Sequence, residues 1–207
     1  LELGSHAGLE AQAAALADDI AYNNHDIDDG LRAQLFTVAD LLDVPLVGPV
    51  FLEVRALYPT IERQRLIHEA IRRLINRMVT DCIDESKRRL AEAKPHSVDD
   101  VRVAGRPLIA FSDEMCAHDA ALKKFLFANM YRHYKVNRET TKARRVVRDL
   151  FSLLLAEPGC LPTDWAARAD GPNGPGTARL VADYIAGMTD RFALDEHRRL
   201  FDPYVRP

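Results

Sequence analysis

An apolar stripe with helical spacing runs through the centre of this chain. Its members recur at steps that keep them on one side of a helix: Leu66, Ile67, Ile71, Leu74, Ile75, Met78, Val79, Cys82 and Ile83. Residues at these positions share one face because a turn of α-helix takes about 3.6 residues. A pattern sustained over so many turns predicts a long helix that packs in a bundle or forms the face of an oligomer.

Helical periodicity also accounts for most of the remaining sequence. We expect a long helix that starts after Thr60, its N-cap, and a later helix capped by Asn137. The other expected helical segments are residues 8–33, 37–42, 49–57, 112–133 and 177–193. Residues 108–111 predict a short strand, and residues 170–176, which are rich in glycine and proline, predict a surface loop. The expected fold class is therefore mostly α.

Composition excludes several functional classes. The 207 residues carry a net charge of -3 with 47% hydrophobic residues, which is typical of a soluble globular protein and argues against a strongly basic nucleic-acid binder. Cys82, Cys116 and Cys160 lack metal or disulfide spacing and indicate a reducing compartment. Because no apolar run could span a bilayer and no signal peptide is visible, we expect a cytoplasmic protein with no membrane contact. The chain lacks an initiator Met, so we expect it to be truncated or processed, with a preceding segment missing.

An acidic row lies in the first expected helix. Asp18, Tyr22 and Asp26 are each one turn apart, and each step of four residues drifts by only about 40° around the axis. A row of this kind offers a carboxylate for a metal ion, a phenol for a phosphate or sugar, and a second acid for sugar hydroxyls. The alternative is a solvated acidic face, and spacing alone leaves both interpretations open.

A basic stripe occupies a later expected helix. Arg138, Lys142 and Arg145 follow helical spacing, and tyrosines precede them. Concentrated positive charge in an acidic protein attracts phosphate, so the stripe could bind a nucleoside triphosphate, an acidic neighbouring subunit or single-stranded nucleic acid. A solvated charged face fits the same spacing.

Three ordered blocks resemble the deoxyguanosine triphosphate triphosphohydrolases, a family of the HD-domain phosphohydrolase superfamily. They cover residues 10–30, 127–133 and 183–190, and the likeness extends to about Phe201. The resemblance implies a helical hydrolase that uses water and a divalent ion such as Mg²⁺ or Mn²⁺. Such an enzyme, a homo-oligomer of nucleotide metabolism, cleaves a deoxynucleoside triphosphate into deoxynucleoside and triphosphate.

The resemblance also implies residue roles. Asp18 matches the last aspartate of the H…HD…D metal set and would be its catalytic member here, Tyr22 matches a position near the sugar and phosphates, and Asp26 one near the 3′-hydroxyl. The other metal ligands of the family lie upstream of this block. We therefore expect residues 1–93 to be the C-terminal part of the catalytic domain, residues 94–207 to be a helical C-terminal domain, and the chain alone to be inactive.

Basic residues of this family approach nucleotide phosphates at subunit contacts, which makes the basic stripe a candidate substrate-binding surface. Two other functions stay open from the sequence. One is a non-catalytic module for nucleotide binding or oligomerisation. The other is a single-stranded DNA-binding protein that would use Arg132, Tyr134 and Lys135 together with the basic stripe.

Overall fold

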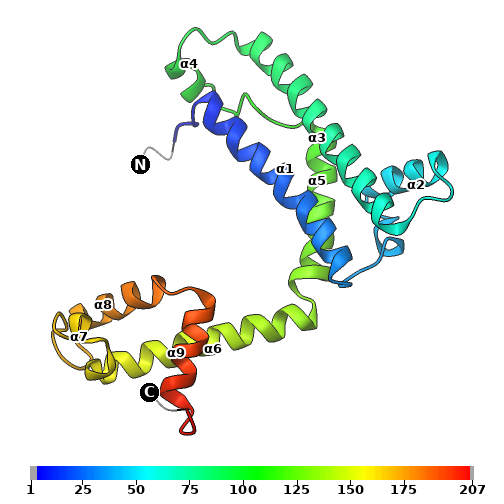
Figure 1. Cartoon of the computed structure of the whole chain (residues 1–207). Coiled ribbons are helices and arrows are strands. Elements are labelled where there is room, and N and C mark those ends of the chain that lie inside the picture. Colours follow the sequence, from blue (N-terminus) through cyan, green and yellow to red (C-terminus); the bar gives the residue numbers. More distant parts are fainter. Residues whose placement is uncertain (1–3, 206–207) are drawn as a thin grey trace. The chain divides into compact units, whose positions relative to one another are not determined.

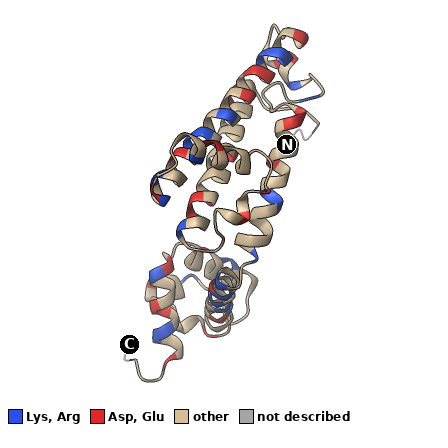
Figure 2. Cartoon of the chain, turned by 90° about the vertical axis from the view of Figure 1, so that its right-hand side faces the viewer, with Lys and Arg blue, Asp and Glu red and all other residues tan. Residues whose placement is uncertain are grey.

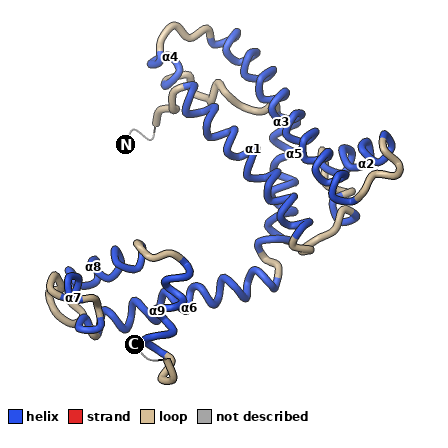
Figure 3. Tube along the Cα trace, viewed as in Figure 1, coloured by secondary structure: helices blue, strands red, loops and turns tan. Residues whose placement is uncertain are grey.

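A computed structural model of the chain describes residues 4–205 and forms two compact units, Leu1–His133 and Tyr134–Pro207. Within the described residues the regular structure is entirely helical (Figures 1 and 3), which confirms the expected fold class. None of these helices combines the length and apolar content needed to cross a membrane. The boundary that we expect after residue 93 concerns the catalytic domain and stays a prediction.

The first unit is built from long helices that run side by side (Figure 1). Helix α3 packs along both α1 and α2, and α5 packs against α1. The elements of this unit are α1 (Leu9–Arg32), η1 (Ala39–Leu41), α2 (Val47–Leu57), α3 (Arg63–Ala93), α4 (Val98–Arg102), α5 (Asp113–Leu126) and the π-helical turn η2 (Phe127–Tyr131).

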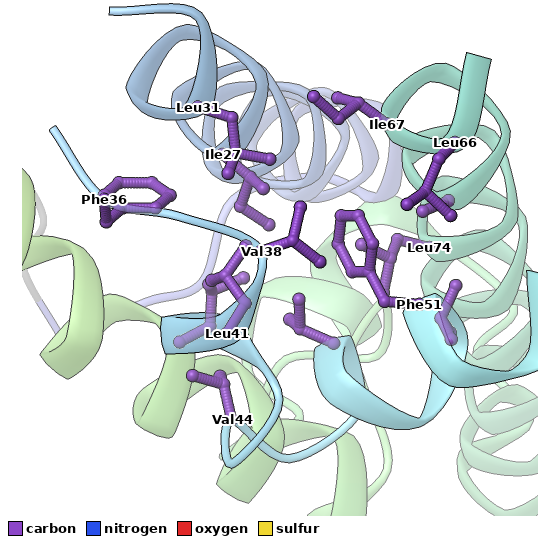
Figure 4. Packing of buried hydrophobic residues seen from close by; sticks show 14 of the residues in the cluster. Ile27, Leu31, Phe36, Val38, Leu41, Val44, Phe51, Leu66, Ile67 and Leu74 are labelled. Carbon is purple, nitrogen blue, oxygen red and sulfur yellow. The ribbon is translucent and has the colours of Figure 1, made fainter. Parts of the chain in front are cut away.

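The main core of this unit lies where α1, α2 and α3 meet (Figure 4). Ile27 of α1, Phe51 of α2 and Leu74 of α3 lose almost all of their solvent exposure there. The predicted apolar stripe of α3 is therefore confirmed at its N-terminal end. Farther along α3, Val79 and Ile83 keep 38% and 46% of their exposure, so part of the stripe has no cover within the described residues.

The expected strand at residues 108–111 is wrong, because this segment is an irregular loop between α4 and α5. Its backbone amides are satisfied by side chains rather than by a neighbouring strand. Gln12 Oε1 accepts hydrogen bonds from the N–H groups of Leu108 and Ile109, and Ser86 Oγ accepts one from Ala110. The apolar run reflects the burial of Leu108 and Phe111 against the helices.

Two expected helix starts are also wrong. Helix α3 begins at Arg63 with Glu62 in the N-cap position, so Thr60 does not cap it. Helix α6 (Tyr134–Ala156) begins three residues before Asn137, which therefore lies inside the helix. Cap residues are common in turns as well as at helix ends, and spacing alone does not separate the two uses.

The second unit contains α6, η3 (Pro158–Cys160), α7 (Thr163–Ala166), α8 (Pro175–Ala186) and α9 (Asp190–Phe201). Helices α8 and α9 pack on α6. The core is formed by Leu154, Leu161, Leu180 and Val181, and the Trp165 ring lies 5.0 Å from the Tyr184 ring.

The single helix expected at residues 177–193 is two helices. Helix α8 ends at Ala186, Gly187 follows, and Thr189 caps α9 by accepting a hydrogen bond from the Phe192 N–H. A glycine lowers helix stability and a threonine hydroxyl satisfies a free N–H at a new helix start, so the two residues together favour a break.

Asp170 closes the predicted loop at residues 170–176 onto the start of α8. Its carboxylate accepts hydrogen bonds from the N–H groups of Gly176 and Thr177 and from the Thr177 hydroxyl. These bonds, led by those from Thr177, hold the pKa of Asp170 below its ordinary value. Asp170 thus performs the capping function that Gly174, the N-cap residue, cannot supply.

Asp170→Asn is expected to lower the Tm of the second unit by about 5 °C at pH 7, since two N–H donors lose their charged acceptor. A carboxyl group whose pKa is lower in the folded than in the unfolded state stabilises the fold at pH values above its unfolded-state pKa. This stabilisation is lost as the pH falls through the folded-state pKa. The difference between wild type and variant should therefore shrink below about pH 4. Fluorescence of Trp165, the single tryptophan, reports this unit. A difference that persists unchanged at pH 2.5 would contradict the charge-based explanation.

Candidate functional site

Helix α1 carries Asp18, Tyr22 and Asp26 at one-turn intervals but at different depths. Asp18 is exposed, Tyr22 keeps 58% of its exposure, and Asp26 keeps only 8%. The row therefore runs from solvent toward the core along the helix. An exposed carboxylate at one end and a buried carboxylate at the other are suited to different contacts with a polar ligand.

The buried end of the row is completed by Tyr131 from η2, whose hydroxyl donates a hydrogen bond to Asp26 Oδ2. The two residues are 105 positions apart in the sequence. Burial, together with hydrogen bonds to Asp26 and Tyr22, raises the pKa of the Tyr131 phenol. Tyr131 therefore stays protonated and acts as a donor at physiological pH.

Sequence reasoning did not select Tyr131 as a site residue. The available signal was the block at residues 127–133, which carried the family resemblance without a role for Tyr131. The structure supplies the role through local geometry, since residues 127–131 form a π-helical turn at the end of α5. Single π-turns are frequent at functional sites because they redirect side chains out of a regular helix.

Polar contacts between α1 and α5 hold this part of the site in place. The buried Asn23 donates from Nδ2 to Asp119 Oδ1 at 2.8 Å. Lys123 lies 2.9 Å from Asp119 and 3.4 Å from Asp19, which joins the same two helices. The buried Asn23–Asp119 hydrogen bond fixes the rotation of α1 against α5, and with it the direction in which the row faces, while the exposed Asp19–Lys123 pair adds little.

The residues of this chain do not by themselves fit the expected divalent metal ion. Between residues 4 and 205, no three side chains of histidine, cysteine, aspartate or glutamate gather where they could share an ion. Hard cations such as Mg²⁺ and Ca²⁺ take about six ligands, several of them from protein or substrate oxygens. Asp18 by itself could provide one of these ligands but not the full set.

The basic stripe lies on α6, in the second unit, and all three members are exposed. Lys142 Nζ lies 2.7 Å from a Glu139 oxygen, and Arg145 Nε lies 3.4 Å from Asp149 Oδ2. Figure 2 shows acidic and basic residues interspersed along the helices. Exposed ion pairs contribute about 1 kcal/mol or less, so an approaching phosphate could replace these carboxylates.

Comparison with known proteins shows what the chain is similar to. A sequence-family profile described as the phosphohydrolase-associated domain matches residues 109–199. Over 202 residues the chain is 61% identical to the deoxyguanosinetriphosphate triphosphohydrolase-like protein of Parvibaculum lavamentivorans, covering 98% of this chain and 51% of that protein. Proteins of the same name from Azorhizobium caulinodans and Caulobacter vibrioides are 55% and 52% identical, with 98% and 97% of this chain and 50% and 51% of those proteins covered.

The chain belongs to the deoxyguanosinetriphosphate triphosphohydrolase-like family. It spans about half the length of the relatives it matches and corresponds to their C-terminal part. The expected family membership is thus confirmed. The roles of Asp18, Tyr22, Asp26, Arg138, Lys142 and Arg145 stay predictions, since nothing in the family match assigns a function to single residues.

Tyr131→Phe is expected to destabilise the first unit by about 1–3 kcal/mol, because a buried carboxylate loses its donor while the ring still packs. Urea denaturation followed by circular dichroism measures the change. Tyr204→Phe is the matched control, since that side chain is 93% exposed and should leave the urea midpoint unchanged. Equal midpoints for the two variants would show that the Tyr131–Asp26 hydrogen bond contributes nothing to stability.

Proposed function

We propose that this chain forms the sugar-binding wall of the nucleotide pocket in a metal-dependent deoxynucleoside triphosphate triphosphohydrolase. The substrate is dGTP or a similar nucleotide, and the products are a deoxynucleoside and triphosphate. The observation that carries the proposal is the row on α1, whose buried member Asp26 is held by Tyr131. A row that is fixed at one end and open to solvent at the other suits a polar ligand that enters from outside.

Each member of the row has a proposed role. Asp18, exposed, would give one carboxylate ligand to a metal ion, and such an ion would supply electrophilic activation of the phosphate chain. Tyr22 offers its exposed phenol to the phosphates or sugar. Asp26 accepts a hydrogen bond from the 3′-hydroxyl, while the Tyr131 bond orients the carboxylate before substrate arrives.

The remaining metal ligands are proposed to come from polypeptide outside these 207 residues. This part of the proposal agrees with the coverage of the relatives, about half of whose length has no counterpart here. The basic stripe is proposed to contact substrate phosphates in a homo-oligomer, with Arg138, Lys142 and Arg145 exchanging their carboxylate partners for phosphate.

The test compares the 207-residue chain with an extended protein, defined as this chain fused behind the upstream half of the Parvibaculum relative. With dGTP and Mn²⁺, the extended protein should release deoxyguanosine and triphosphate, as measured by ion-exchange chromatography. The 207-residue chain should give no turnover above the protein-free control. Equal turnover per molecule by the two proteins would reject the proposal that ligands outside this chain are required.

A further inference from the structure

An apolar groove runs between α1 and α3, with a volume of about 240 Å³. Its walls include Ala13, Ala17 and Ala21 from α1 and Ile75, Val79 and Ile83 from α3. The groove lies over a small core cluster formed by Ile20, Met78, Phe111 and Met115. It is therefore the uncovered side of a core rather than an isolated depression on the surface.

We propose that this groove is the docking site of an apolar helix from the upstream half of the protein. The inference rests on the proposed function in one respect, namely that this chain works together with such a half. The relatives contain about as many residues outside the match as within it, and in those proteins that remainder is large enough to supply such a helix.

The shape of the groove favours a helix as its occupant. The three alanines of α1 are spaced one turn apart. Small side chains at that spacing let a second helix pack closely, near the lower limit of the usual interaxial distance of about 8–10 Å. Val79 and Ile83, with 38% and 46% of their exposure retained, stand on the opposite wall at the same one-turn spacing. Covering two large apolar side chains in this way removes their surface from water.

The position of the groove relative to the row gives the docking a consequence for the site. Ala17, Ala21 and His25 line the groove, and each directly precedes one member of the row, Asp18, Tyr22 or Asp26. Successive residues on a helix are about 100° apart, so the groove and the row occupy neighbouring faces of α1. A helix seated in the groove would place its own side chains beside Asp18.

Cys82 is a natural reporter for the proposal because it lines the groove and is a free thiol. Iodoacetamide labelling, quantified by mass spectrometry for each cysteine, is measured in the 207-residue chain and in the extended protein. The labelling rate of Cys82 should fall by at least about ten-fold in the extended protein, since reaction then requires local opening. Cys160, exposed and in the second unit, should react at the same rate in both proteins.

Val79→Asp tests whether protection arises from the groove. In the 207-residue chain it should leave the Tm nearly unchanged, and in the extended protein it should restore Cys82 labelling to the rate of the short chain. Val103→Asp is the matched control, because Val103 is 77% exposed and lies outside the groove. If the fusion does not fold, co-purification of the two halves expressed as separate chains is measured instead, with loss expected for Val79→Asp alone.

Unchanged Cys82 labelling in an extended protein that unfolds cooperatively would overturn the proposal, as would separate halves that do not co-purify. Protection that rises with concentration in the 207-residue chain would assign the groove to a second copy instead. A protected Cys82 in an extended protein without dGTP turnover would reject the proposed function and retain the docking site. dGTP turnover by an extended protein whose Cys82 is not protected would reject the docking site and retain the proposed function.

Discussion

Gly48→Ala is expected to destabilise the first unit by about 3 kcal/mol or more, which is the upper range for overpacking a core. A Cβ atom at this position would lie 1.9 Å from the backbone oxygen of Leu42 and 2.5 Å from its carbonyl carbon. Backbone atoms cannot rotate away as a side chain can. The clash must therefore be relieved by moving α2 as a whole.

The surroundings of Gly48 leave little room for that movement. Its N–H donates a hydrogen bond to the Val44 oxygen at 2.9 Å. Leu46, two residues earlier, already has a φ of 67°, a conformation that costs free energy for a branched side chain. Val47 and Phe51, which lie on either side of Gly48 in α2, are fully buried in the main core.

Urea denaturation followed by circular dichroism at 222 nm measures the effect of Gly48→Ala. Gly8→Ala is the control in the same unit, since its Cβ would meet only Glu10 Oε2, at an ordinary 3.6 Å, and its change should stay within about 1 kcal/mol. A Gly48→Ala midpoint equal to that of the control would mean that the turn at residues 42–48 adapts freely.

Asp18→Asn in the extended protein is expected to lower dGTP turnover by about a thousand-fold. A metal ion contributes several kcal/mol of charge stabilisation, and each factor of ten in rate corresponds to about 1.4 kcal/mol. Because Asp18 is exposed, the amide should leave the folded state intact. The Tm of the variant should match that of the parent protein while its bound metal content falls.

Asp19→Asn provides the matched control for this experiment. It is the next residue on α1, carries the same charge, and faces Lys123 at 3.4 Å rather than the row. Its turnover should stay within about three-fold of the parent, since an exposed ion pair contributes little. Equal loss in both variants would indicate a general effect of negative charge on α1 and would remove Asp18 from the metal site.

Much of the fold was predictable because the relevant interactions are local. Helix α1 was expected at residues 8–33 and spans Leu9–Arg32. The helix expected at residues 112–133 begins at Asp113, and its last part is the π-helical turn η2. The errors fall where tertiary contacts replace local rules. The segment at residues 108–111 reads as a strand by composition, yet side chains of α1 and α3 satisfy its amides.

In the candidate site, too, the local features were predictable and the tertiary contacts were not. The spacing of Asp18, Tyr22 and Asp26 follows from helix geometry alone and required no knowledge of the rest of the chain. The burial of Asp26 and its bond to Tyr131 join positions 105 residues apart, which no local pattern encodes. The lack of cover over Val79 and Ile83 is equally invisible in the periodicity of α3, because a stripe looks the same whether or not a partner packs on it.

The amino-acid order by itself determined which segments are helical and which residues share a face, since both depend on neighbours within a turn or two. It also carried the family resemblance, which agrees with the 61% identity to the Parvibaculum relative over 202 residues. Tertiary structure alone decided which members of a face are buried, which distant side chain meets Asp26, and which apolar surface stays open. Those properties depend on how the helices of each unit pack against one another, and packing joins residues that the sequence keeps far apart.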